Sequence, residues 1–92
     1  MYHLQILTPE DTFFDGDIQS LIIPGTSGDL GILSNHAPLI TSLKEGTVTI
    51  TDQNKKKSFY KVNDGFFEVK KNQAILLVDS IGETSSIASH MI

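Results

Sequence analysis

Residues 22–40 of the chain read IIPGTSGDLGILSNHAPLI. Glycine recurs at every third position in this stretch, at Gly25, Gly28 and Gly31, and an apolar run lies on each side. Such glycine density between strand-like segments is typical of tight turns with positive φ, or of backbone that passes close to another part of the fold. The spacing lacks the pattern of a phosphate-binding loop, and no helix pattern follows it. We therefore predict a strand followed by a turn and a short hairpin.

Outside this stretch, apolar and polar residues alternate with a period of two. Tyr2, Leu4 and Ile6 alternate with polar residues, and Val48 and Ile50 alternate with threonines. This alternation is typical of half-buried antiparallel strands. Turn signals rich in Gly, Pro, Asn and Asp separate the runs. The sequence predicts an all-β fold, a flattened sandwich or barrel of two antiparallel sheets.

Two runs, 21–23 and 74–78, are continuously apolar. We expect them to be central strands, covered on both faces or contacted by a partner. From Ser80 onwards, Gly82 and several serines interrupt the strand pattern. We therefore expect one β-sandwich domain over residues 1–79 and an irregular C-terminal tail over residues 80–92, with at most one short helical turn.

The composition excludes several classes of function. A chain of 92 residues without cysteine forms one domain, with no disulfide framework and no thiolate metal site. The net charge is −4 and all seven basic residues are lysines, which argues against nucleic-acid binding and excludes a bidentate arginine clamp. No signal peptide is visible, and the apolar runs are too short to span a bilayer. Membrane association is expected only through a partner.

No arrangement of residues points to catalysis, a metal or a cofactor. The histidines are scattered singly, without metal-ligand spacing, and the serines lack a nucleophile elbow. Four acidic residues near the N-terminus are expected in turns rather than around calcium, and they are Glu10, Asp11, Asp15 and Asp17. The run Lys55–Lys57 is expected at a solvated hairpin tip. Phe59 and Phe66 should share a face opposite their apolar neighbours, either as core of a second sheet or as a partner patch.

The 22–40 stretch, together with residues 2–10, 14–18, 63–69 and 74–79, closely resembles the epsilon subunit of F-type ATP synthases, called delta in mitochondria. The family pattern reads roughly Val-Pro-Gly-Thr-x-Gly-Asp/Glu-Phe/Leu-Gly-Val/Ile-x-x-x-His-Ala-Pro-Leu. This chain departs from it at Ser34-Asn35, where the family usually has Pro-Gly, and at Asp64, where it usually has Gly. Asn and Asp tolerate left-handed backbone better than most residues, so the fold is expected to survive. The resemblance implies about ten short strands.

The resemblance implies a non-catalytic rotor subunit of the central stalk in a proton- or sodium-translocating ATP synthase, which links the gamma subunit to the c-ring for rotary coupling. It places one group of residues against the polar loops of the c-ring, namely Thr26, Ser27, Gly28, Asp29 and His36. It places Thr8, His36 and Ala37 against gamma. The implied location is peripheral, at the cytoplasmic face of the bacterial inner membrane, held there by the complex.

The family commonly continues into a C-terminal two-helix hairpin that this sequence does not contain, and ATP binding and self-inhibition reside in that hairpin. We therefore expect neither property here, and no cofactor. The alternative interpretation is a stand-alone β-sandwich module for protein interaction. Co-purification with gamma would separate the two.

Overall fold

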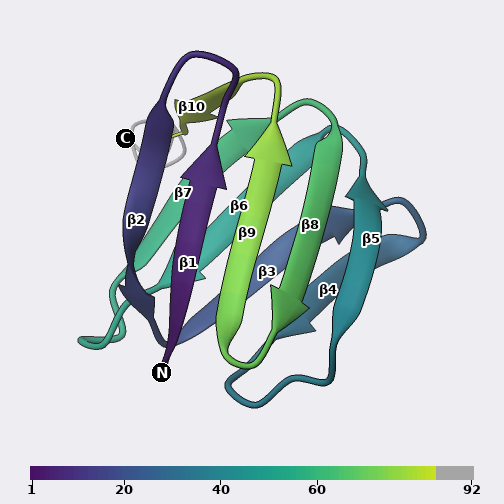
Figure 1. Cartoon of the computed structure of the whole chain (residues 1–92). Coiled ribbons are helices and arrows are strands. Elements are labelled where there is room, and N and C mark those ends of the chain that lie inside the picture. Colours follow the sequence, from purple (N-terminus) through teal and green to yellow (C-terminus); the bar gives the residue numbers. More distant parts are fainter. Residues whose placement is uncertain (85–92) are drawn as a thin grey trace.

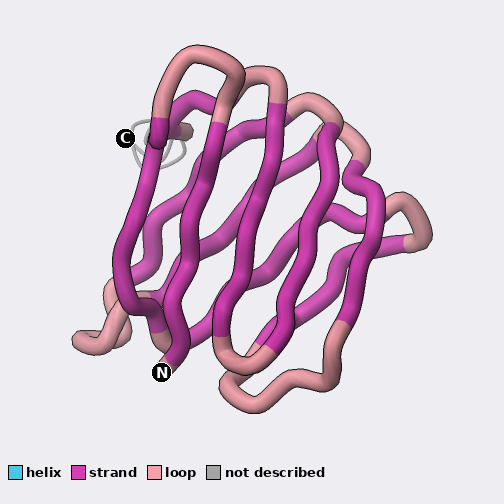
Figure 2. Tube along the Cα trace, viewed as in Figure 1, coloured by secondary structure: helices cyan, strands magenta, loops and turns pink. Residues whose placement is uncertain are grey.

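The computed structural model describes residues 1–84, and within that range the chain consists of β-strands joined by short turns (Figure 2). The strands are β1 (Tyr2–Leu7), β2 (Thr12–Ile18), β3 (Ser20–Gly25), β4 (Gly28–Ile32), β5 (Leu39–Leu43), β6 (Gly46–Thr51), β7 (Lys57–Val62), β8 (Gly65–Lys70), β9 (Gln73–Val78) and β10 (Ile81–Glu83). The expected all-β class and the expected number of short strands are both confirmed.

The strands form one continuous sheet in the order β10-β7-β6-β3-β5-β8-β9-β1-β2, with β4 paired to β3. The sheet curls so that β2, β1, β9, β8 and β5 face a second layer of β10, β7, β6, β3 and β4 (Figure 1). The layers are joined where Gly25 of β3 pairs with Leu43 of β5. All pairings are antiparallel except β1 with β9, which is parallel. The predicted layered architecture is therefore present, built from one curled sheet instead of two separate ones.

The apolar residues of the alternating strands meet between the layers and form one core. Its fully buried members are Tyr2, Leu4, Ile6, Ile18, Leu21, Ile23, Ile32, Leu43, Val48, Ile50, Val62, Phe67, Val69, Ala74, Leu76 and Val78. The Tyr2 hydroxyl donates a hydrogen bond to the Ile32 carbonyl oxygen at 2.5 Å, which ties β1 of one layer to β4 of the other. Burial raises the pKa of Tyr2, so its hydroxyl remains a donor.

The edge strand β2 approaches β7, the neighbour of the other edge strand β10, where Phe13 of β2 meets Tyr60 of β7. The ring centroids are 5.3 Å apart and the rings are nearly perpendicular, at 85°. An irregularity in the β1–β2 register between Ile6 and Leu7 accompanies this contact. Because β-bulges increase local twist, the bulge helps β2 to turn toward β7, and the edge-to-face pair then covers the edge of the core.

The two continuously apolar runs differ from expectation. They are central strands, but each is covered on one face only. Ile22 is 42% exposed between the buried Leu21 and Ile23, and Leu77 is 47% exposed between the buried Leu76 and Val78. Of the two alternatives, cover on both faces within the chain is therefore wrong, and contact with a partner stays a prediction, because the outward apolar side chains are open to one.

The tail also differs from expectation at its start. Residues 81–83 form β10, which pairs antiparallel with β7 through Ile81 and Val62. Gly82 lies opposite Lys61 at the outer face, where a side chain is not needed for the core. The strand is then followed by a hydrogen bond from the Thr84 amide to the Phe59 carbonyl oxygen at 3.0 Å. The expected irregular tail over residues 85–92, with His90, lies outside the described residues.

Candidate functional site

The hairpin that joins β3 to β4 holds four of the five residues expected at the c-ring, whereas the fifth, His36, lies in the loop between β4 and β5. Gly25 pairs with Gly28, and Thr26 and Ser27 form the exposed turn between them. Gly28 has a φ of 129°, which a glycine adopts more readily than other residues, so this part of the glycine prediction is confirmed. The Thr26 amide donates to the Ser42 carbonyl oxygen at 3.3 Å, which fixes the hairpin to β5.

Asp29 follows this turn as a residue of β4, opposite Pro24. Its side chain is exposed, and within residues 1–84 the carboxylate makes no ion pair. Asp29 is therefore not a turn residue that bonds to its own backbone, as an aspartate next to a glycine turn often is. An exposed carboxylate on a rigid strand is available to a donor on another chain, and its contact role stays a prediction.

His36 lies in the loop between β4 and β5, and its ring orders that loop. The His36 Nδ1 lies 2.7 Å from the Ala37 carbonyl oxygen, and the His36 amide donates to the Leu33 carbonyl oxygen at 3.2 Å. Because a carbonyl oxygen only accepts, Nδ1 carries the proton and Nε2 is the ring atom left for another group.

A pair of asparagines holds the His36 loop to the turn between β8 and β9. The Asn35 amide donates to Asn72 Oδ1 at 2.7 Å, and Asn72 Nδ2 donates to Asn35 Oδ1 at 3.1 Å. Both residues are left-handed, with φ of 65° and 59°. The Asn72 carbonyl oxygen also accepts from the His3 amide at 3.1 Å. Asn35 stands where the family usually has glycine. It adopts the left-handed backbone that glycine favours, and its side chain adds a contact with Asn72.

Thr8 lies at the opposite end of the sheet from His36. It closes the β1–β2 turn, where its amide donates to the Asp11 carbonyl oxygen at 2.9 Å. Leu7 pairs with Leu77 near the end of β9, Val78 pairs with Gly65, and Gly65 pairs with Leu43 at the end of β5. The His36 loop precedes the start of that same strand. Thr8 and Ser42 line the same groove, and Thr26 bonds to Ser42, so Thr8 and Thr26 share one end of the sheet. His36 and Ala37 lie at the other end.

An exposed apolar face lies between these two ends, and the site predictions missed most of it. On the outer side of β5, β8 and β9, Ile40 is 72% exposed, Phe66 59% and Leu77 47%. Phe66 pairs with both Ser42 and Leu77, so the residues are close neighbours across the sheet. We call Ile40, Phe66 and Leu77 the outer apolar face. The sequence predicted that Phe59 and Phe66 share one face, but this is wrong, because Phe59 lies in β7 of the other layer and only Phe66 belongs here. The neighbouring apolar residues at 39–40 and 74–78 were the available signal for Ile40 and Leu77.

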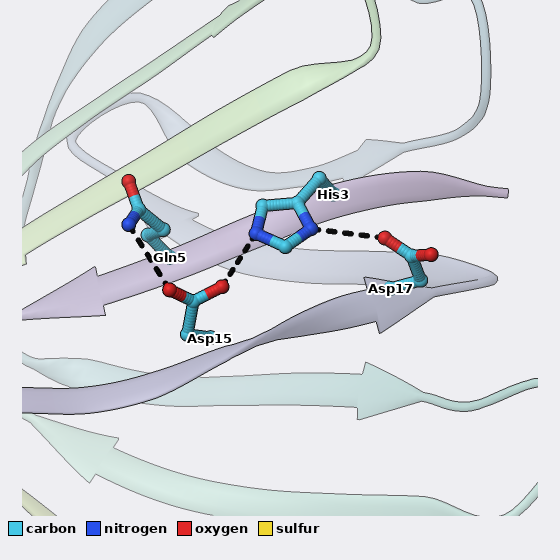
Figure 3. A network of polar contacts seen from close by, with 4 residues as sticks. All are labelled: His3, Gln5, Asp15 and Asp17. Carbon is cyan, nitrogen blue, oxygen red and sulfur yellow. Dashed lines mark hydrogen bonds and ion pairs between the residues drawn. The ribbon is translucent and has the colours of Figure 1, made fainter.

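A polar network covers the outer side of β1 and β2 (Figure 3). His3 Nε2 lies 2.5 Å from Asp15 Oδ1, and His3 Nδ1 lies 2.9 Å from Asp17 Oδ1. Gln5 Nε2 also donates to Asp15 Oδ2 at 3.2 Å. The hydrogen bonds to Asp17 and then Asp15 raise the pKa of His3, although the ring is exposed. The expectation that Asp15 and Asp17 are turn residues is wrong, because both lie in β2 and connect it to β1.

The described residues offer little else for chemistry. Among residues 1–84 no cluster of three or more His, Asp and Glu side chains is arranged to hold a metal ion. In the same range, no helix is long and apolar enough to cross a membrane. The Lys55 hairpin is confirmed as a turn: Lys55 has a φ of 64°, and Asp52 Oδ1 accepts from the Asn54 amide at 2.8 Å.

Comparison with known proteins gives a consistent result. Residues 1–84 match the family described as "ATP synthase, Delta/Epsilon chain, beta-sandwich domain". The ATP synthase epsilon chain of Chlorobium limicola is 40% identical over 80 residues, covering 87% of this chain and 91% of that protein. The epsilon chain of Campylobacter concisus is 38% identical over 77 residues, covering 84% of this chain but 60% of that protein.

Solved structures show the same fold at lower identity. A chain of the Euglena gracilis mitochondrial ATP synthase superposes with a TM-score of 0.83 at 17% identity, covering 87% of this chain and 51% of the other. A chain from the central stalk and c-ring structure of the Tetrahymena thermophila mitochondrial ATP synthase gives a TM-score of 0.72 at 16% identity, covering 87% and 64%.

Proposed function

This chain belongs to the delta/epsilon chain family of ATP synthases, and on that premise we propose that it is a non-catalytic rotor subunit of the central stalk. In this role it links the gamma subunit to the c-ring of a proton- or sodium-translocating enzyme, at the cytoplasmic face of a bacterial inner membrane. The observation that carries the proposal is the family match over residues 1–84, which includes every described strand.

The outer apolar face is the surface that we assign to gamma. Thr8 lies beyond one end of this face and His36 and Ala37 lie beyond the other, so a gamma segment that runs along the face meets all three. Burying the exposed fractions of Ile40, Phe66 and Leu77 contributes about 3–5 kcal/mol, because full burial of such a side chain is worth roughly 1.5–3 kcal/mol. The apolar face therefore accounts for an affinity that the exposed polar contacts alone do not supply.

The β3–β4 hairpin is the surface that we assign to the polar loops of the c-ring. Its turn, Thr26 and Ser27, is exposed, and Asp29 presents a carboxylate from the following strand. The hydrogen bond from Thr26 to Ser42 fixes the hairpin to β5, which also carries Ile40 of the outer apolar face. One rigid strand thus connects the surface for gamma with the surface for the c-ring.

Cysteine cross-linking in the assembled enzyme tests the proposal. An Asp29→Cys variant should form a disulfide with a cysteine placed in the c-ring polar loop, whereas Lys55→Cys, on the far hairpin between β6 and β7, should not. Co-expression with gamma should give a complex that survives gel filtration. Failure to bind gamma, or cross-linking from Lys55→Cys but not from Asp29→Cys, would contradict the assignment.

A further inference from the structure

A groove of about 470 Å³ opens at the end of the sheet that carries Thr8. It is lined by Leu7, Thr8, Pro9, Ser42, Leu43, Asp64, Gly65, Phe66, Leu77, Val78 and Asp79. Three neighbouring strands contribute to the groove, because Gly65 of β8 pairs with Leu43 of β5 and with Val78 of β9. Leu77 and Phe66 of the outer apolar face also belong to the groove, so the face and the groove are continuous. The lining is mostly apolar, which suits an aliphatic or aromatic side chain.

The charged residues of the groove are both acidic. Asp64 and Asp79 are exposed, and no lysine is among the lining residues. Within residues 1–84, neither carboxylate takes part in a salt bridge. An apolar hollow flanked by two carboxylates attracts a segment in which a hydrophobic side chain stands beside a basic one, and it repels an acidic segment.

We propose that this groove is an anchor site, in which an apolar side chain of the partner fills the hollow and an adjacent lysine or arginine pairs with Asp64 and Asp79. The proposal rests on the proposed function, because the gamma subunit is the source of that segment. Continuity between the groove and the outer apolar face gives gamma a defined end point on this chain. The outer apolar face contributes most of the buried contact area, and the groove fixes the position of gamma along that face.

The test measures binding of the full chain to the gamma subunit of the same genome by calorimetry, at low and high salt. The variant Asp64→Asn/Asp79→Asn should bind about three- to tenfold more weakly at low salt, as expected for two partly exposed charge pairs. Its affinity should also depend less on salt than that of the unmodified chain. Glu83→Gln removes a carboxylate from exposed β10 outside the groove and should leave binding unchanged.

A second pair of variants tests the apolar part. Phe66→Ser should weaken binding at least about tenfold, because one exposed aromatic contact is lost. Ile22→Ser, on the other layer, should not weaken it. If the chain binds gamma and all four variants bind equally at both salt concentrations, the anchor site is wrong and the rotor function stands. If the chain does not bind gamma, both fail. If the groove variants change self-association instead, the occupant is a second copy and the proposal is overturned.

Discussion

Replacing Gly65 by alanine should destabilise the domain strongly, and the structure gives the reason. Gly65 begins β8 and pairs with Val78 of β9. A Cβ at this position collides with the Leu77 carbonyl oxygen and lies 3.0 Å from the Val78 Cα. Both atoms belong to the backbone, so no side-chain rotation removes the collision. The two strands must separate, in a region where Gly65 also pairs with Leu43 of β5.

The expected cost is about 3 kcal/mol, the upper end of the usual range for an extra group forced into packed structure, since backbone must move. For a domain of this size, each kcal/mol lowers the melting temperature by roughly 4–8 °C, which gives a fall of about 12–24 °C. Urea unfolding followed by circular dichroism measures the free energy, and a thermal melt measures the temperature.

Gly31→Ala is the matched control. The glycine spacing of residues 22–40 predicted that Gly31 serves a positive φ or a close backbone approach, but a Cβ on Gly31 has nothing within 4 Å and its φ is not in the left-handed region. That prediction is wrong for Gly31. Its alanine variant should be neutral or more stable by up to about 1 kcal/mol, because the unfolded chain loses freedom. Equal stabilities for the two variants would refute the argument from close approach.

Three further predictions concern hydrogen bonds. Tyr2→Phe should cost about 1 kcal/mol in urea unfolding, because the buried Ile32 carbonyl oxygen loses its donor; an unchanged midpoint would contradict this bond. Because the pKa of His3 is higher in the folded chain than in the unfolded chain, protonation of His3 stabilises the fold. This contribution to the free energy of unfolding is fully present below the unfolded pKa near 6.5, and it is lost as the pH rises through the higher folded pKa. Replacing both aspartate partners by asparagine should flatten that pH dependence of unfolding, and an unaltered profile would count against the network. Asn72→Gly keeps the left-handed backbone but removes the link to Asn35, so the Asn35 amide should exchange with solvent faster than in the parent chain.

The strands were largely predictable because their signal is local. Alternation places every second residue on one face, and Tyr2, Leu4 and Ile6 are buried as that rule requires. The loss of alternation in the apolar runs was interpreted as burial on both faces within the chain or contact with a partner. The exposed Ile22 and Leu77 exclude the first alternative and leave the second as a prediction.

The candidate site was less predictable because it depends on register between distant strands. Nothing local in the sequence indicates that β1 pairs in parallel with β9, so nothing indicated that Thr8 lies far from His36. The resemblance assigned both residues to one partner without placing them. The register places them beyond opposite ends of the outer apolar face, which makes a single extended partner necessary if both assignments hold.

The proposed rotor role requires that each contact loop be fixed to the sheet, because a loop that yields under load transmits no torque. The hydrogen bonds of this chain provide such fixing at two of the proposed contact loops. Thr26 holds the β3–β4 hairpin to β5, and Asn35 and Asn72 bond reciprocally between the His36 loop and the β8–β9 turn. The β1–β2 turn at Thr8 is instead closed within the turn, by bonds between Thr8 and Asp11, as the unassigned β6–β7 hairpin is by Asp52. We therefore expect the β3–β4 hairpin and the His36 loop, which are bonded to distant parts of the sheet, to carry more of the load than the Thr8 turn.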